Sequence, residues 1–469
     1  MSMFAKHMPA APEFRALLNV GCLFDIQAGH YIKGKHGENI LNGGIAPLTG
    51  LGGQGNTYKS TISHFFALTI LDRYFRAEMN LLDTEMSAGG HRLKKLAAAM
   101  QYICNTDLVW HETANPTGRI LITDSTVVSG NKWFDQLKEF AKAKIEAAKT
   151  YKLTTPFLSR DGSLFKAFVP SIGEVDSLSR LDVDATNAML DKNSAGESGN
   201  NTEAMASAKA KHQMLIQCPE LTASCGLYLL LTAHVDDSIT IDAYAPQTKK
   251  LAFIKNGLKF KYVPNQFFFL MNNLWFCFGA ARMVNQNTKA AEYPRDANDT
   301  DDLNTDLMKV TVQNLRGKYG PTGAPYEIIV SQSEGVQVSL TEFNYLKEYG
   351  RFGLGGHDRA YYLELCPEIS MQRTTIRTKI REHAKLRRAF EITSEMCQMF
   401  NIWHDLDPEL ICTPKQLYED LKAKGYDWDV LLNTRGYWVF EEDQHPLPFL
   451  STMDLLEMRI GRYRPYWMK

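Results

Sequence analysis

The glycine-rich segment Gly52–Thr61, GGQGNTYKST, constrains the fold of this chain more than any other stretch. Its glycines let the backbone curl so that N–H groups point inward, and the apolar run Ile62–Phe75 that follows has the character of a helix. A helix that begins directly after such a turn offers unpaired N–H groups and the positive end of its dipole to an anion. The segment therefore predicts a loop that enters a helix and holds phosphate.

The residues from Gly53 to Ser60 fit the pattern G-x-x-x-x-G-K-[ST] except that Tyr58 stands in place of the second glycine. The lysine of this pattern reaches the terminal phosphates of a nucleotide, and the hydroxyl residue coordinates Mg²⁺. We therefore expect a nucleotide site with Mg²⁺ at Ser60. The predicted nucleotide contacts are Gly52, Gly53, Gly55, Asn56, Thr57, Tyr58, Lys59, Ser60 and Thr61.

Composition excludes several classes of protein. The 469 residues carry 52 Lys+Arg and 53 Asp+Glu, so this is not a globally basic protein that coats DNA. Eight scattered cysteines without a CxxC pair argue against a zinc module and a disulfide scaffold. No apolar run reaches the ~18 residues of a membrane span, and residues 1–13 lack the apolar centre of a signal peptide. We expect an intracellular, cytoplasmic protein with no membrane contact.

Short apolar strands alternate with helical stretches from about residue 41 to 336, which predicts an α/β fold with a mostly parallel sheet covered by helices. Residues 1–40 form a lead-in that offers a possible protomer contact, and 337–469 form a smaller α+β domain. The expected strands are Met79–Asp83, Arg119–Thr123, Phe168–Val175, Gly226–Ala233 and Leu274–Phe278, and the expected helices include Lys132–Thr150 and Thr202–Gln217.

The C-terminal region has its own start signals and a basic segment. Thr413-Pro414 predicts a helix to about Lys424, Gly436–Phe440 reads as an aromatic strand, and another helix is expected from Ser451. The segment Arg373–Arg388 has seven basic residues and one acid. If this segment is helical, it forms either a basic stripe for accessory DNA binding or a surface helix packed on acids of the core. The stripe would consist of Arg373, Arg377, Arg381, Lys385 and Arg388.

Polar residues stand where the predicted strands end. Glu85 follows one strand and could polarise an attacking water. Asp176 follows another and could hold Mg²⁺ beside Ser60, with Asp124 as the competitor for this role. His234 ends a third strand, where a polar side chain can sense the terminal phosphate.

The phosphate loop, Glu85, Asp176 and His234 follow one another in this order along the chain. This arrangement resembles the RecA-type recombinase core over about residues 40–336, and most closely the phage UvsX-like branch. That branch also has an aromatic residue before the Lys-Ser of its phosphate loop. The resemblance implies a DNA-dependent ATPase that uses ATP and Mg²⁺ and is compatible with a phage-encoded protein acting in a bacterial host. It implies that Lys59, Ser60 and Thr61 bind phosphates and Mg²⁺. Glu85 would be the catalytic base, Asp176 the metal-side acid and His234 the γ-phosphate sensor.

The resemblance also implies two mobile DNA-binding loops, at about Asp182–Asn201 and Val235–Gly257. Basic and aromatic groups in the second would contact the DNA. Arg92 is the candidate to stack on adenine. Arg316 and Lys318, in LRGKYGPTG, would reach the ATP of a neighbouring protomer. The predicted DNA-binding residues are Lys249, Lys250, Phe253 and Lys255.

The leading hypothesis is a recombinase that polymerises on single-stranded DNA and exchanges strands with duplex DNA. The alternative is a DnaB-type hexameric helicase, because Arg316–Gly323 (RGKYGPTG) resembles the finger turn of that family and EMSA follows the second strand. A filament is open whereas a helicase ring is closed. A third hypothesis is a non-catalytic DNA-binding protein of the same fold, although the joint presence of Lys59, Ser60, Glu85 and Asp176 argues against it.

Overall fold

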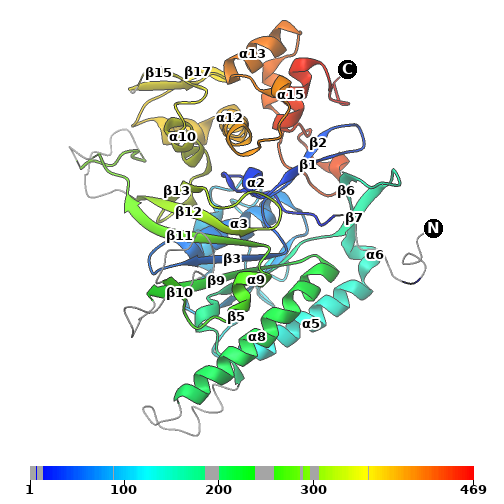
Figure 1. The fold of residues 1–469 in the computed structure, drawn as a ribbon, viewed down its shortest axis with the longest axis vertical. Coiled ribbons are helices and arrows are strands. Elements are labelled where there is room, and N and C mark those ends of the chain that lie inside the picture. The colour runs from blue at the N-terminus through cyan, green and yellow to red at the C-terminus, as the bar shows by residue number, and fades with distance from the viewer. Residues whose placement is uncertain are drawn as a thin grey trace.

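The computed structural model describes residues 7, 14–87, 89–184, 200–237, 258–285, 289–295, 306–357 and 359–468. A large mixed sheet runs through the middle of the molecule (Figure 1). Among the described residues it contains ten strands in the order β14-β13-β12-β11-β3-β9-β8-β4-β5, with β10 paired to β9. The sheet separates two layers of helices.

Six neighbouring strands of this sheet are parallel, which confirms the predicted mostly parallel arrangement. The five strands expected from the sequence are all present, with ends shifted by a few residues. β3, which carries the glycine-rich segment, lies between β9 and β11. The parallel strands are β3 (Leu48–Gly53), β4 (Glu78–Asp83), β5 (Ile120–Asp124), β8 (Ser171–Asp176), β9 (Leu227–Asp237) and β11 (Asn273–Arg282).

An antiparallel flank extends the sheet beyond β11. It consists of β12 (Leu307–Gly317), β13 (Pro325–Ser331) and β14 (Gly335–Val336), while β10 (Leu258–Phe260) returns antiparallel to β9. Smaller sheets pair β1 (His30–Lys33) with β2 (Asn39–Asn42), β6 (Lys152–Leu158) with β7 (Leu164–Phe168), and β15 (Leu354–His357) with β16 (Ala360–Leu363) and β17 (Cys366–Met371).

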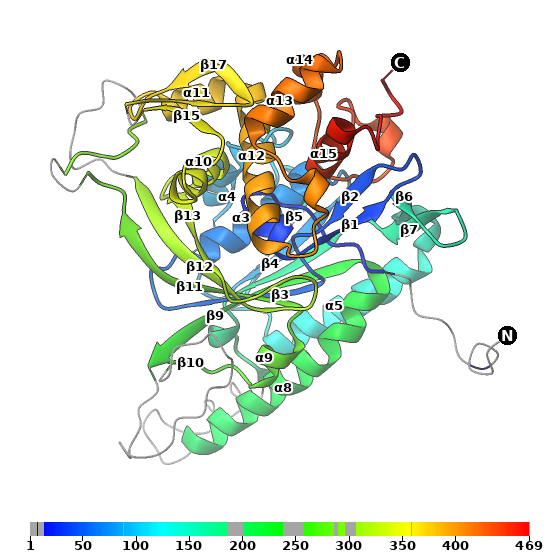
Figure 2. The same ribbon diagram turned by 45° about the horizontal axis from the view of Figure 1, so that its top comes forward.

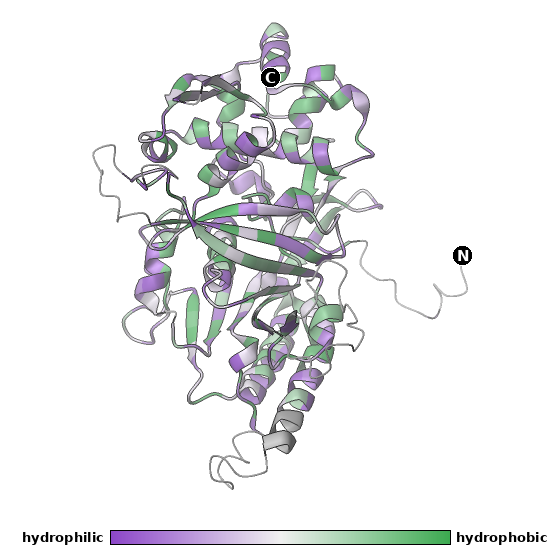
Figure 3. Cartoon of the chain, turned by 60° about the vertical axis from the view of Figure 1, so that its left-hand side comes forward, coloured by the Kyte–Doolittle hydropathy of each residue, from purple (hydrophilic) through white to green (hydrophobic). Residues whose placement is uncertain are grey.

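Helices cover the two faces of the large sheet, and each face has its own hydrophobic core (Figure 2). One face carries α5 (Gly130–Glu146), α8 (Asn200–Cys225) and α9 (Gln266–Leu270). The other carries α2 (Phe24–Gln27), α3 (Lys59–Arg73) and the C-terminal helices. Figure 3 shows hydrophobic residues along the central sheet and the helices that cover it. Within the described residues, no helix is long and apolar enough to cross a membrane.

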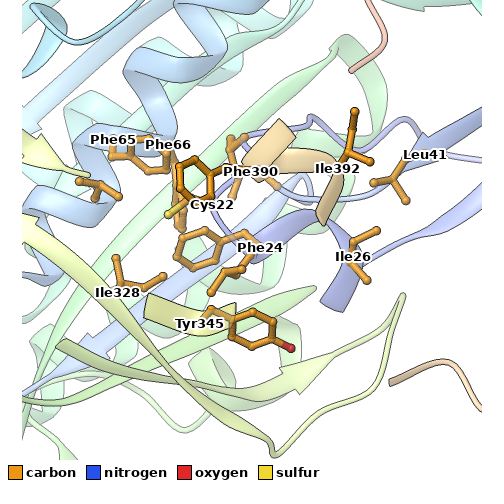
Figure 4. Packing of buried hydrophobic residues seen from close by; sticks show 14 of the residues in the cluster. Cys22, Phe24, Ile26, Leu41, Phe65, Phe66, Ile328, Tyr345, Phe390 and Ile392 are labelled. Carbon is orange, nitrogen blue, oxygen red and sulfur yellow. The ribbon is translucent and has the colours of Figure 1, made fainter. Parts of the chain in front are cut away.

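The C-terminal region shares one core with the N-terminal part of the chain. Phe390 and Ile392 of α12 (Ala384–Ile402) lie in the same cluster as Phe24 and Phe66 (Figure 4). The remaining described helices are α4 (Gly90–Ala97), α6 (Ala148–Tyr151), α10 (Val338–Glu348), α11 (Ile376–Glu382), α13 (Pro414–Ala423), α14 (Trp428–Leu432) and α15 (Thr452–Ile460), together with short 3₁₀ turns at Leu178–Arg180, Pro408–Leu410 and Glu442–Gln444.

Both predicted C-terminal helix starts are confirmed, because Thr413 and Ser451 each form a capping box at the first turn of their helix. The predicted strand Gly436–Phe440 is wrong. That segment forms no strand, and the side chains of Trp438 and Phe440 are instead buried against Tyr74.

The predicted single stripe of basic residues is also wrong. The helix breaks at His383, where the backbone is extended, so that α11 and α12 are separate. Arg377 is buried and ion-paired with Asp306 and Glu334. Arg388 is buried and pairs with Glu391. Arg377 thus joins α11 to acids of the core, as in the packed-helix alternative, and neither Arg377 nor Arg388 belongs to an exposed stripe.

Replacement of Phe390 tests whether the two regions unfold together. Phe390 is fully buried in the shared core, so Phe390→Ala should lower the free energy of unfolding by about 3–5 kcal/mol. We expect one cooperative transition in urea, followed by fluorescence and by circular dichroism. The exposed Ile411 gives the control, because Ile411→Ala should change stability by less than about 0.5 kcal/mol. Two separate transitions would contradict a shared core.

Candidate functional site

The register of the parallel strands brings the predicted residues to one edge of the sheet. Gly53 at the end of β3 pairs with His234 of β9, and Asp83 at the end of β4 pairs with Asp176 of β8. Asp124 of β5 lies on the far side of Asp83. Residues at the carboxyl ends of parallel strands form the usual ligand site of such a sheet.

The glycine-rich loop closes tightly on itself. A Cβ at Gly53 would lie 2.5 Å from Thr57 Oγ1 and 2.9 Å from the carbonyl oxygen of Cys277, so only glycine fits there. Tyr58 has a φ of 60°, in the left-handed region that glycine favours. The tyrosine thus keeps a backbone conformation suited to the glycine that it replaces, at a cost of about 1 kcal/mol or more. Tyr58 is the N-cap of α3, and its side chain makes no capping hydrogen bond. The first N–H groups of α3 are therefore left for another acceptor.

Lys59 is the first residue of α3 and is almost fully buried. Burial lowers its pKa, while the negative charges of Glu85 and Asp176 oppose that shift. A buried ammonium without a close carboxylate is costly unless an anion compensates it. Among the described residues no carboxylate lies within 4 Å of Lys59, so a bound phosphate would complete its charge balance.

Asp176 connects α3 to the sheet. Its Oδ1 accepts hydrogen bonds from Ser60 Oγ at 3.0 Å and from Thr232 Oγ1 at 2.6 Å. Its Oδ2 is buried without a hydrogen-bond partner among the described residues, and burial raises the pKa of this carboxyl group. Mg²⁺ prefers a few hard oxygen ligands and keeps several waters, so Ser60 and Asp176 fit such an ion. Asp124 is exposed and its carboxylate bonds to Thr126; it lies on β5, two strands away from the β8 strand that carries Asp176.

Glu85 is held by two side chains from neighbouring strand ends. His234 Nε2 lies 2.5 Å from Glu85 Oε1, and Ser177 Oγ donates to the same oxygen at 3.1 Å. Burial would raise the pKa of Glu85, but the bonds from His234 and Ser177 and the charge of Lys59 outweigh it and lower the pKa. The carboxylate is therefore ionised and partly exposed, as a general base requires.

Arg92 of α4 also reaches the beginning of α3. One guanidinium nitrogen donates to the carbonyl oxygen of Gln332 at 2.5 Å, and another lies 3.5 Å from Thr61 Oγ1. The side chain is therefore fixed beside the loop but has a polar partner of its own.

Sequence reasoning missed a buried ion pair beneath this site. His64 Nδ1 of α3 lies 3.0 Å from Glu174 Oε1 of β8, and both side chains are buried. Burial would lower the pKa of His64, but the charge of Glu174 outweighs it and raises the pKa to about 9. The signal in the sequence was a histidine one turn after Ser60, inside an otherwise apolar helix.

Lys211 of α8 was missed as well. It is buried, and its Nζ donates to the carbonyl oxygens of Leu178 at 2.9 Å and Tyr262 at 3.4 Å. Leu178 precedes the first predicted DNA loop and Tyr262 follows the second. Ser179 connects this point to the site, because its Oγ accepts from the backbone N–H of His234. Burial lowers the pKa of Lys211 to about 8.

Arg316 and Lys318 do not join the site. Arg316 pairs with Leu274 near the start of β11, and the backbone N–H of Lys318 bonds to Asn272, so both lie at the amino edge of the parallel strands. They therefore lie at the opposite end of the parallel strands from Lys59, which follows the carboxyl end of β3. The predicted DNA-binding residues Lys249, Lys250, Phe253 and Lys255 lie outside the described residues, as does most of the first predicted loop.

No protein-family model matches this sequence, and no curated protein matches it either. Among solved structures, the chain is similar to a RadB recombinase at a TM-score of 0.31 and 12% identity. That similarity covers 63% of this chain and 92% of the RadB chain. Similarity at this level does not define a family for the chain, and it gives no support to the UvsX-like branch.

Two glycines give a matched pair of variants, one in the loop and one outside it. Gly53→Ala should weaken binding of an ATP analogue at least about tenfold, because the added methyl group meets the backbone at Cys277. Gly279→Ala should bind normally, since Gly279 is not a predicted nucleotide contact and a Cβ there meets nothing within 4 Å. Isothermal titration calorimetry measures both affinities. Equal binding by the two variants would contradict a nucleotide in this loop.

The His64–Glu174 pair predicts a pH dependence of stability. The pKa of His64 is about 9 in the folded chain against an ordinary value of 6.5, so its stabilisation is complete below about pH 6.5 and is lost as the pH rises through 9. Glu174→Gln should lower the free energy of unfolding at pH 7 by about 3–5 kcal/mol and remove this alkaline loss. Urea unfolding at several pH values tests both effects; parallel pH profiles for the two proteins would contradict the pairing.

Proposed function

We propose that this chain is an ATP-dependent recombination protein that forms filaments on single-stranded DNA and exchanges strands with duplex DNA. The observation that carries the ATPase part is the convergence of Lys59, Ser60, Asp176 and Glu85 at one carboxyl edge of the sheet. The sequence resemblance to RecA-type recombinases supplies the rest of the proposal.

In this proposal each residue of the site has a separate task. Lys59 and the first N–H groups of α3 bind the phosphates of ATP. Ser60 and Asp176 hold Mg²⁺, which when bound would neutralise phosphate charge. Glu85 orients a water molecule and accepts its proton, and Arg92 lies close enough to contact the nucleotide. His234 contacts Glu85 directly, so it is placed to respond to the terminal phosphate.

The position of Arg316 and Lys318 supports assembly in which copies stack head to tail. Because both cations lie at the amino edge, they are remote from the phosphate loop of their own chain and are available to the carboxyl edge of another copy. A cation supplied across such an interface stabilises charge on the transferred phosphoryl group and makes hydrolysis depend on assembly. A head-to-tail contact that does not close produces a filament.

The residues that flank the two predicted DNA loops also support the proposal. Ser179 and His234 are hydrogen-bonded, and Lys211 joins the chain before the first loop to the chain after the second. A change in the position of His234 would therefore be transmitted to both loops through few contacts. We assign DNA binding to Lys249, Lys250, Phe253 and Lys255 on the second loop.

Two variants separate binding from hydrolysis. Glu85→Gln should bind ATP and Mg²⁺ with nearly normal affinity but reduce DNA-stimulated hydrolysis about 10²–10⁴-fold, because the base is lost while the loop is kept. Lys59→Ala should lose binding itself. Phosphate release with and without poly(dT) measures hydrolysis, and calorimetry measures binding. Full hydrolysis by Glu85→Gln would contradict the role of this carboxylate.

Electron microscopy of the Glu85→Gln variant with ATP and single-stranded DNA tests the assembly. Long helical filaments are expected. Closed six-membered rings would instead favour the DnaB-type helicase, and single particles unchanged by either ligand would contradict both functions.

A further inference from the structure

A pocket of about 290 Å³ lies at the amino edge of the sheet, opposite the nucleotide site. It is bounded by residues 14–16 before α2, by Pro47 just before β3, by the β6–β7 hairpin, by the end of α8 and by the start of β9. Figures 1 and 2 both show the β6–β7 hairpin beside the C-terminal end of α8. None of the residues assigned to ATP lines this pocket.

Aromatic rings line part of the pocket. The ring centroids of Phe14 and Phe165 lie 4.5 Å apart, and Phe14 also contacts Phe157. Phe168 lines the pocket beside them. Phe14, Phe165 and Phe168 are only partly buried, so part of their surface is open to the pocket. Three partly exposed phenylalanines in one concave site form an apolar surface for a flat group.

The rim of the same pocket is basic. Arg15, Lys152 and Lys166 line it and are exposed, and none of the described residues that line it is acidic. None of these three cations has a carboxylate partner within 4 Å among the described residues, and Lys152 Nζ lies over the ring of Phe168, 5.0 Å from its centroid. Some surface lysines elsewhere are paired with a carboxylate, such as Lys385 beside Asp429. In a chain with a net charge of -1, an unpaired basic rim concentrates positive charge at this edge.

Lys318 lies near the rim, although it does not line the pocket. Burial and the positive charges of Arg316 and Arg15 lower the pKa of Lys318. Arg15 of the rim and Lys318 are therefore close enough to repel each other. A bound polyanion would reduce this repulsion.

We propose that this pocket is a second contact for single-stranded nucleic acid, distinct from the two predicted loops. Bases stack on Phe14, Phe165 and Phe168, and the phosphates pair with Arg15, Lys152 and Lys166. Cations interleaved with aromatic rings are the combination that binds unpaired strands, since every base has a face to stack. The stacked bases of a duplex cannot enter such a pocket. The proposal extends the proposed function but requires no ATP turnover.

The test uses the full chain, without nucleotide, and a fluorescent oligo(dT). The double variant Arg15→Ala/Lys166→Ala should bind about tenfold or more weakly. The slope of log affinity against log salt should fall by about 1.4, because two phosphate contacts are lost. The control Lys132→Ala/Lys142→Ala removes two exposed cations of α5 and should keep both affinity and slope. An unchanged slope in the pocket variant would overturn the proposal.

Cross-linking identifies the contact directly. Oligo(dT) that contains 4-thiothymidine should cross-link to the peptides that carry Phe14, Phe165 or Phe168, and Phe165→Leu should reduce that product. Cross-links confined to the predicted loops would overturn the proposal. So would loss of self-association in the pocket variant with unchanged DNA affinity, because the pocket would then bind a second copy of the chain. Failure of ATP hydrolysis alone leaves these binding results intact and contradicts only the ATPase proposal.

Discussion

The buried carboxylate of Asp176 is the contact on which the arrangement of the site depends. Through one oxygen it holds Ser60 at the beginning of α3 and Thr232 of β9, so it fixes the helix against the carboxyl edge of the sheet. Its second oxygen has no partner among the described residues, and a buried carboxylate of this kind is expensive unless something compensates it. The His64–Glu174 pair lies just beneath and supports the same helix. The fold therefore keeps a buried carboxyl group at the position where Mg²⁺ is proposed to bind.

The two edges of the sheet differ in chemistry. The carboxyl edge carries Asp176 and Glu85 beside the phosphate loop and Asp83 and Asp124 farther along, whereas the amino edge carries Arg316, Lys318 and the basic aromatic pocket. Opposite charges at the two edges are what the proposed head-to-tail assembly requires. In the two proposals, the carboxyl edge binds a nucleotide and the amino edge binds an extended strand.

The sequence predicted the parallel strands well, because short apolar runs are local signals, and the register of those strands brings Lys59, Asp176 and Glu85 to one edge. It also predicted the helix starts at Thr413 and Ser451 from their capping residues. It could not place Arg377 and Arg388. The pairing of Arg377 with Asp306 and Glu334, the hydrogen bond from Arg388 to the carbonyl oxygen of Leu450 and the break at His383 all depend on tertiary packing. The same limit explains why Lys211 and the Phe14–Phe165 pocket were missed: their partners are distant in sequence, and no periodic pattern marks them.

A cryo-electron microscopy structure of the protein with a non-hydrolysable ATP analogue and Mg²⁺ would show whether the phosphate loop binds nucleotide. We expect a triphosphate at the beginning of α3, with its terminal phosphate beside Lys59 and a metal ion between Ser60 and Asp176. Density for the nucleotide elsewhere, or an empty loop at saturating analogue, would contradict it.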